Sequence, residues 1–222
     1  TFKGKAFHSA YWDHSFNLAN KRVAVVGTGA SAIQFVPAIA PEVAELKVFQ
    51  RTASYVLPRV NRQYSEATKA LFRKVPLANK ALRAGIYATY ESRALAFTRF
   101  KGLMKVAAGR PFMTMLNRQV KDPALREKLI PNYPAGCKRL LLSSEYLKTF
   151  SRPNVQLITE GIDCVYEQGI QTADGTRHEV DAIVYGTGFA ATDFLAPLHI
   201  TGRNGTTLKQ AWKNGAARSE EH

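Results

Sequence analysis

The sequence has few cysteines, no long apolar run and fewer acidic than basic residues. Its two cysteines, Cys137 and Cys164, cannot form a disulfide framework, and neither has a CxxC or metal-ligand spacing with histidine, so no metal site is expected. The most apolar stretch, residues 23–40, is interrupted by glycine, glutamine and proline, which excludes a membrane-spanning helix. The first twenty residues lack a basic segment followed by an apolar one and do not resemble a signal peptide. We therefore expect a cytoplasmic protein that does not bind membranes.

The excess of basic residues is large but dispersed. The chain has 31 Lys and Arg against 17 Asp and Glu, a formal net charge of +14. Clustered cations would suggest nucleic-acid binding, but here they are scattered through a helical stretch that contains no nucleic-acid motif. We expect no nucleic-acid partner. A solvated basic face, or a surface that meets an acidic partner domain, explains the charge better.

The first half of the chain predicts a β-α-β unit followed by helices. Residues 21–26 form a short β-branched run typical of a buried strand, a small-residue helix is expected at about residues 30–40, and residues 45–50 form the second strand. Residues 65–131 have a helical pattern, with Ser65 as N-cap and Asp122 as the cap of a second, short helix. This region interrupts the α/β pattern and is therefore predicted to be an insertion.

The second half returns to mixed α and β structure. We expect a helix near residues 145–150, a strand at 154–158, and two further strands that meet across an Asp174-Gly175 turn, the last of them spanning 179–185. Residues 1–20 show neither period and are predicted to be an ordered connector.

A glycine motif lies between the first predicted strand and helix. The GTGASA sequence matches GxGxxG/A, and its position directly after a hydrophobic strand and at the start of a helix makes this weak pattern specific for dinucleotide binding. The first glycine permits a tight turn, the second lets the main chain approach a pyrophosphate, and the final alanine permits close packing, while the helix N-terminus attracts the phosphate charge. The expected cofactor-binding residues here are Gly27, Thr28, Gly29, Ala30, Ser31, Ala32 and, on the helix, Gln34.

The end of the second predicted strand indicates which dinucleotide binds. A carboxylate at this position would bind the ribose 2′-hydroxyl of NADH and repel a 2′-phosphate. The sequence instead has Arg51 and Thr52, a planar cation and a hydroxyl that both suit a phosphate dianion. We therefore predict NADPH rather than NADH.

The first thirteen residues resemble a family fingerprint. Phe2, Gly4, His8 and Trp12 occupy the fixed positions of the FxGxxxHxxxW pattern of type I Baeyer-Villiger monooxygenases, and Asp13 follows as in many members. The related N-hydroxylating and flavin-containing monooxygenases usually end this pattern in Phe or Tyr, so the tryptophan favours the Baeyer-Villiger branch. The order of the later segments is also similar. The resemblance implies a structural or hinge role for the histidine on an interdomain linker.

The resemblance implies an enzyme that uses FAD, NADPH and O2. In such an enzyme a C4a-peroxyflavin oxygenates a ketone to an ester or lactone. Arg139, in the sequence GCKR, resembles the active-site arginine of the family, and a permanent cation there would stabilise the peroxyflavin anion. Lys138 would help to hold the nicotinamide nucleotide. The fold implied is α/β, a Rossmann-like NADP-binding domain with a helical insertion and a short β-meander.

A second family signature follows near the end of the chain. Residues 180–189 resemble DxIVxATGF, with Gly186 in place of the usual alanine, which is a sterically mild exchange. In the family this turn approaches the cofactors and leads back toward the FAD domain. Thr187 and Gly188 are therefore expected to bind cofactor through main-chain contacts.

The expected domain organisation follows from the same comparison. Residues 1–20 would be the linker, 21–60 and 132–210 the NADPH-binding domain, 61–131 the helical insertion, and 211–222 a truncated return to the FAD domain. The sequence has one GxGxxG/A motif, whereas the family has a second for FAD. We therefore expect a fragment, inactive by itself, that lacks the main FAD motif and the FAD domain.

Alternatives remain at this point. The substrate could be a small ketone or a sulfide, so an N- or S-oxygenating flavin monooxygenase is close to the leading hypothesis. A non-catalytic NADP(H)-binding module, whose basic helices engage a partner, is a second possibility. A reductase that passes hydride to flavin without oxygenation is a third, against which Trp12 and Arg139 argue.

Overall fold

The structure, a computed structural model, describes residues 1–59, 63–98, 105–189 and 198–213. It divides into two compact units, residues 1–187 and 188–222, and each is described by itself. The predicted limits of the domains within the first unit remain predictions.

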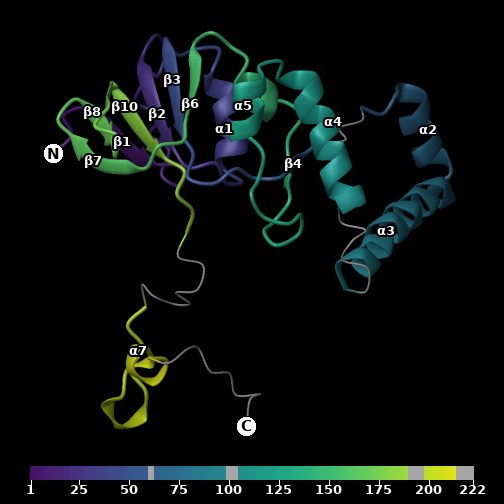
Figure 1. Cartoon of the computed structure of the whole chain (residues 1–222). Helices are drawn as coiled ribbons and strands as arrows, with labels where there is room; N and C mark the ends of the chain where they lie inside the picture. The colour runs from purple at the N-terminus through teal and green to yellow at the C-terminus, as the bar shows by residue number, and fades with distance from the viewer. Residues whose placement is uncertain (60–62, 99–104, 190–197, 214–222) are drawn as a thin grey trace. The chain divides into compact units, whose positions relative to one another are not determined.

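A five-stranded parallel sheet forms the centre of the first unit (Figure 1). Its strand order is β1-β10-β2-β3-β6, and every neighbouring pair is parallel. The strands are β1 (Lys5–His8), β2 (Arg22–Val26), β3 (Glu45–Phe49), β6 (Val155–Ile158) and β10 (Ala182–Tyr185). The helix α1 (Ala32–Ile39) connects β2 to β3. The predicted β-α-β unit and the α/β fold class are therefore confirmed.

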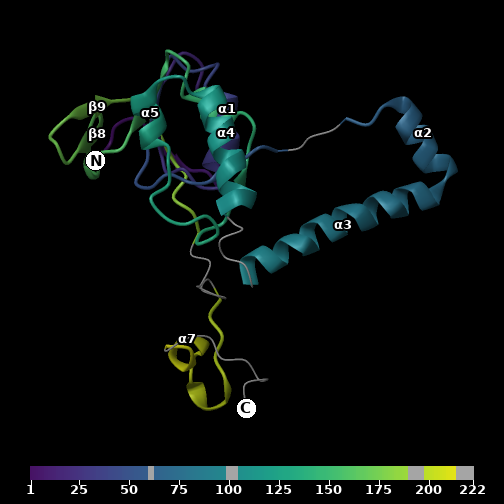
Figure 2. The same ribbon diagram turned by 45° about the vertical axis from the view of Figure 1, so that its right-hand side comes forward.

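Each face of the sheet has its own core because successive strand residues point to opposite faces. On one face, Val23 and Val25 of β2 pack with α1 and with the helices α4 (Arg110–Gln119) and α6 (Tyr146–Thr149). On the other face, Ala24 and Val26 pack with the segment that carries Ile170. Figures 1 and 2 show α1 and α4 on one side of the sheet and the strands β8 (Gly169–Thr172) and β9 (Arg177–Glu179) on the other.

The edge strand β1 was not predicted. Only Phe7 is buried within it, so the short segment has no recognisable alternation. Its partner is β10, at the far end of the sequence, with Lys5 opposite Ala182. The connector predicted for residues 1–20 is therefore partly a strand of the sheet.

The β-meander covers the second face and corrects one prediction. Its antiparallel strands are β7 (Ile162–Tyr166), β8 (Gly169–Thr172) and β9 (Arg177–Glu179), and β8 and β9 meet across the turn at Gly175, as expected. The single strand predicted at residues 179–185 is wrong. The chain leaves the meander after Glu179 and enters the parallel sheet at Ala182 as β10.

The helical region matches the predicted caps. The Ser65 side chain accepts the N–H of Thr68, and the Asp122 side chain accepts the N–H of Ala124. The helices are α2 (Glu66–Lys74), α3 (Pro76–Thr98), a π-helical turn (Lys105–Gly109) that leads into α4 (Arg110–Gln119), α5 (Pro123–Lys128) and α6 (Tyr146–Thr149). The helices α2 and α3 contact each other, and none of their described side chains is buried. A short parallel pair, β4 (Val56–Leu57) and β5 (Leu141–Leu142), lies beside α4.

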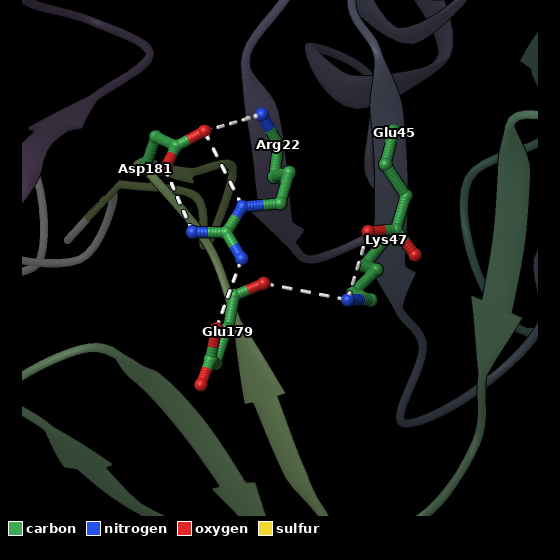
Figure 3. Close-up of polar contacts among 5 residues, drawn as sticks. All are labelled: Arg22, Glu45, Lys47, Glu179 and Asp181. Atoms are coloured by element: carbon green, nitrogen blue, oxygen red, sulfur yellow. Dashed lines mark hydrogen bonds and ion pairs between the residues drawn. The ribbon is translucent and has the colours of Figure 1, made fainter.

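A charge cluster closes the amino ends of the central strands (Figure 3). The Arg22 guanidinium binds Asp181 at 2.9 Å and Glu179 at 3.0 Å, and its main-chain N–H donates to the Asp181 carboxylate at 2.8 Å. Lys47 donates to Glu45 at 3.1 Å and to the Glu179 carbonyl oxygen at 3.3 Å. These bonds lower the pKa of the Asp181 carboxyl and raise that of the Arg22 guanidinium. This amino-end charge cluster ties the meander to the sheet.

In the second unit, described up to residue 213, the structure has a 3-10 turn (Arg203–Gly205) and α7 (Leu208–Ala211). A capping box begins α7, in which the Thr207 hydroxyl accepts the Gln210 N–H and the Gln210 side chain accepts the Thr207 N–H.

Candidate functional site

The candidate site lies at the carboxyl ends of the parallel strands, where β2 ends in the glycine turn. Gly27 has a φ of +108°, and its N–H donates to Phe49 of β3 at 3.1 Å. A Cβ at this position would lie 2.5 Å from the carbonyl oxygen of Gly186. Both the dihedral and the close approach require glycine, so the first position of the motif serves the fold itself.

The second glycine has a different environment. A Cβ on Gly29 would meet no atom within 4 Å, so nothing in the described chain explains its lack of a side chain. Gly29 and Ala30 are both exposed, whereas Ala32 is fully buried at the start of α1. An exposed turn before a helix N-terminus presents free N–H groups, as the approach of a phosphate requires.

Two polar side chains of the motif are already bonded within the protein. The buried Thr28 hydroxyl donates to the carbonyl oxygen of Thr52 at 3.2 Å. The exposed Gln34 amide donates to the Ala30 carbonyl oxygen at 2.8 Å. Ser31 adopts helical dihedrals at the N-cap and makes no side-chain capping bond. Thr28 therefore fixes the glycine turn to the segment after β3.

That segment carries the predicted 2′-phosphate residues. Arg51 is exposed, Thr52 is half-buried, and no carboxylate pairs with Arg51 in the described part of the chain. The preceding Gln50 is buried, and its side-chain amide donates to the Lys128 carbonyl oxygen at 2.7 Å. Gln50 thus ties the end of β3 to the end of α5 and leaves Arg51 facing solvent.

The Cys-Lys-Arg segment adjoins an aromatic cluster. The Lys138 ammonium lies 4.6 Å from the ring centre of Tyr133, and both Lys138 and Arg139 are exposed. The Tyr55 hydroxyl donates to the Tyr133 carbonyl oxygen at 3.1 Å. Within the described residues no hydrogen bond or ion pair joins Arg139 to the glycine turn. The predicted catalytic arginine is therefore available to a ligand but is not held against the nucleotide turn.

The second signature meets the glycine turn directly. The Gly186 N–H donates to Val26 at 2.8 Å, and the main chain of Gly186 and Thr187 lies beside Gly27. Thr187, the last residue of the first unit, is exposed, and Gly188 has a φ of +92°. The turns that follow β2 and β10 are therefore neighbours at one edge of the sheet.

The fingerprint residues lie on both faces of the sheet, since Phe2 packs with the core on the meander face and Trp12 with the core on the helical face. The Trp12 ring meets Phe7 of β1 at 5.2 Å and Phe35 of α1 at 5.3 Å, both edge-on. Asp13 binds Lys5 and the Ser15 hydroxyl, which lowers the pKa of its carboxyl far below the usual range. The His8 imidazole accepts the Ala10 N–H. The structural or hinge role of the histidine stays a prediction.

Sequence reasoning missed Tyr55 and Tyr133. Both rings are half-buried and lie 5.7 Å apart, and burial raises the pKa of the Tyr55 phenol. Tyr55 follows Arg51 by four residues and Tyr133 precedes Lys138 by five, but only the fold brings the two tyrosines together.

Other classes of site are absent from the described ranges. No group of three or more His, Cys, Asp or Glu side chains is placed to hold a metal ion. Cys137 and Cys164 are exposed free thiols. Among the described helices none combines the length and apolar character needed to cross a membrane.

Comparisons with known proteins agree with this geometry. A Baeyer-Villiger monooxygenase of Pseudomonas aeruginosa is 46% identical over 214 residues, which cover 96% of this chain and 40% of that protein. One from Streptomyces coelicolor is 46% identical over 218 residues, with 97% and 41% covered. The chain thus spans about 40% of the length of these curated relatives.

Solved structures show the same fold. A steroid monooxygenase bound to NADP superposes with a TM-score of 0.75 at 32% identity, over 97% of this chain and 48% of that one. An open structure of cyclohexanone monooxygenase gives 0.76 at 29% identity, over 96% and 49%. The family model for flavin-binding monooxygenase-like proteins matches residues 1–199. The chain belongs to the flavin-binding monooxygenase-like family.

Proposed function

We propose that this chain is the NADPH-binding portion of an FAD-dependent monooxygenase that converts ketones into esters or lactones. The observation that carries the proposal is the glycine turn between β2 and α1, which is open at Gly29 and is bonded through Thr28 to the segment that carries Arg51, an exposed cation without a carboxylate partner among the described residues. The relatives named Baeyer-Villiger monooxygenases and the NADP-bound steroid monooxygenase structure support it.

The turn would bind the pyrophosphate of NADPH. The exposed main chain at Gly29 and Ala30 lets a phosphate approach, and the N-terminus of α1 supplies N–H groups and a positive dipole end. Among the described residues nothing lies within 4 Å of a Cβ on Gly29, and the side chains of Thr28 and Gln34 are turned to main-chain carbonyls. The residues present therefore fit a dinucleotide.

The segment after β3 would select NADPH. Arg51 offers two parallel N–H donors and Thr52 a hydroxyl for the 2′-phosphate. Lys138, on the neighbouring segment, adds a third polar group for phosphate. Thr187 and Gly188 would border the cofactor through their main chains, since the main chain of Gly186 and Thr187 lies beside Gly27.

FAD, held by other parts of the complete protein, would supply the redox chemistry by accepting hydride from NADPH and activating O2. Arg139 would place a permanent positive charge beside the reacting oxygen, where negative charge develops during transfer to the ketone. One oxygen atom enters the ester and the other leaves as water, with NADPH supplying the two electrons.

The complete gene product provides the test. It should have the absorbance of a flavoprotein, and with cyclohexanone as probe it should oxidise NADPH and consume O2 in step with lactone formation. A colourless protein, or NADPH oxidation without lactone, would overturn the proposal. Cyclohexanone is the probe because a cyclohexanone monooxygenase of similar fold is known with this ketone bound.

The role of Arg139 is tested separately. An Arg139→Ala variant should lose lactone formation, while its NADP+ affinity changes by less than about threefold, since the arginine is assigned to oxygen transfer rather than to the nucleotide. Unchanged lactone formation would remove Arg139 from the mechanism.

A further inference from the structure

Lys138 is held by an aromatic ring rather than by an acid. Its ammonium lies 4.6 Å from the ring centre of Tyr133, within the range of a cation–π interaction. Five other described lysines have carboxylate partners instead, namely Lys3, Lys5, Lys47, Lys69 and Lys148. A ring orients the ammonium without neutralising its charge, which leaves that charge available to an anion.

The Tyr133 ring is itself anchored. The Tyr55 hydroxyl donates to the Tyr133 carbonyl oxygen at 3.1 Å, and the two rings meet edge-on. Tyr55 packs in turn on Phe112 of α4, a fully buried core residue, with ring centres 5.2 Å apart. The Tyr55 carbonyl oxygen accepts the Leu141 N–H at 2.9 Å. A chain of contacts thus runs from the core to the Lys138 ammonium.

The same contacts join the two segments that carry the predicted phosphate ligands. Arg51 lies four residues before Tyr55, and Lys138 lies five residues after Tyr133. The hydrogen bond from Gln50 to Lys128 joins these segments a second time. Tyr133 is therefore placed to set Lys138 relative to the segment of Arg51.

We propose that Tyr133 is a positioning residue, whose ring holds the Lys138 ammonium in place for a phosphate of bound NADPH. This inference rests on the proposed function, in which Lys138 binds that nucleotide. The ring acts through Lys138 and does not itself touch the nucleotide. Its π-face carries the effect on Lys138, whereas the hydrogen bond from Tyr55 uses the Tyr133 main-chain carbonyl and does not depend on the ring.

The test measures the Kd of NADP+ for the complete gene product by calorimetry. Tyr133→Leu removes the π-face and should weaken binding about threefold to fivefold, the range expected for an exposed cation–π contact. Tyr133→Phe keeps the π-face and should bind within twofold of the wild type. On a Lys138→Ala background, Tyr133→Leu should have no further effect, because the group it positions is gone.

The outcomes separate this inference from the proposed function. If Lys138→Ala leaves the Kd unchanged, the assignment of Lys138 to the nucleotide fails. If Lys138→Ala weakens binding but Tyr133→Leu does not, the positioning role is overturned while the proposed function stands. Equal losses in Tyr133→Leu and Tyr133→Phe, or an undiminished loss on the Lys138→Ala background, would also overturn it, because both indicate a general structural effect.

Discussion

The two ends of the parallel sheet differ in whether their positively charged side chains are paired with carboxylates. At the amino ends, Arg22 and Lys47 are fully engaged by carboxylates and a carbonyl oxygen. At the carboxyl end of β3, Arg51 is exposed and has no carboxylate partner in the described chain, and the same holds for Lys138 and Arg139 on the segment before β5. The amino-end cations satisfy the fold, whereas these three cations remain available to a ligand.

The difference follows from the geometry of parallel sheets. The strand-to-helix turn at the carboxyl end exposes main-chain N–H groups that attract anions, and ligands of open α/β sheets bind at this edge. A carboxylate there would compete with the ligand. At the amino end, where no ligand is expected, paired charges join the meander to the strands and contribute to stability alone.

The largest effect on stability is expected from a substitution in the glycine turn at the carboxyl end of β2. Gly27→Ala forces a side chain onto a φ of +108° and places its Cβ 2.5 Å from the Gly186 carbonyl oxygen. We expect a loss of roughly 2–5 kcal/mol in the free energy of unfolding, measured by urea denaturation. Gly29→Ala is the matched control, because its Cβ meets nothing within 4 Å. It should leave stability within about 0.5 kcal/mol and weaken NADP+ binding. Equal stability of the two variants would contradict this division.

The second prediction tests whether the carboxyl-end cations serve a ligand. Arg51→Ala should weaken NADP+ binding about tenfold to a hundredfold, the value of a charge-assisted contact, and NAD+ binding by less than twofold. Arg51→Lys keeps the charge but loses the bidentate fork and should fall between the two. Titration calorimetry with both nucleotides gives the comparison, and equal losses for NADP+ and NAD+ would refute the 2′-phosphate assignment.

The region around Gly27 and Arg51 also shows how much of the structure could be predicted from the sequence. The unit from residue 21 to 50 is specified locally by a β-branched strand, a glycine turn and a small-residue helix, so its fold and the location of Arg51 could be predicted. The strand β1 and the break at Val180 could not. Both depend on pairing with distant strands, and Asp181 leaves the meander to bind Arg22. The Tyr55–Tyr133 contact was missed for the same reason, since no local pattern links the two residues.

A third prediction concerns the amino end. Asp181→Asn should lower the free energy of unfolding by about 1 kcal/mol, because it breaks a partly exposed bidentate ion pair and weakens the bond to the Arg22 N–H. Glu179→Gln, which removes a more exposed partner of the same arginine, should cost less. Neither change should alter NADP+ affinity. A nucleotide effect as large as that of Arg51→Ala would remove the distinction between the two ends.

The pH dependence of stability follows from the same carboxylate. Its partners hold the folded-state pKa of Asp181 below the unfolded value of about 3.9, so its contribution is present above that value. The contribution is lost as pH falls through the folded pKa. Asp181→Asn should therefore flatten the acid limb of the stability curve. Asp13 and Asp174, whose pKa values are also lowered, leave a residual slope.

A fourth prediction concerns a buried hydroxyl that has no hydrogen-bond partner in the described part of the chain and lies away from the candidate site. The Tyr146 hydroxyl is buried in the helical core, has no partner among the described residues, and has its pKa raised by that burial. Tyr146→Phe should raise the free energy of unfolding by up to about 1 kcal/mol. Tyr55→Phe, which removes a hydroxyl that donates to Tyr133, should lower it by a similar amount. A destabilised Tyr146→Phe protein would indicate a partner for that hydroxyl.

The smallest effect on stability is expected at Gly186, where a substitution distinguishes strain in the backbone dihedrals from steric crowding of the added side chain. Gly186→Ala restores the usual alanine of the family signature. Its Cβ would lie 3.5–3.6 Å from Val26, Ala32 and Phe35, which is ordinary contact distance. Restricting the unfolded chain should then stabilise the protein by about 0.5 kcal/mol. The carbonyl oxygen of this same residue blocks a side chain on Gly27, so the two glycines share one environment and differ in backbone dihedral and direction of approach. If Gly186→Ala were instead as destabilising as Gly27→Ala, steric crowding would extend over the whole turn. The open space at Gly29 would then no longer support the approach of a ligand there.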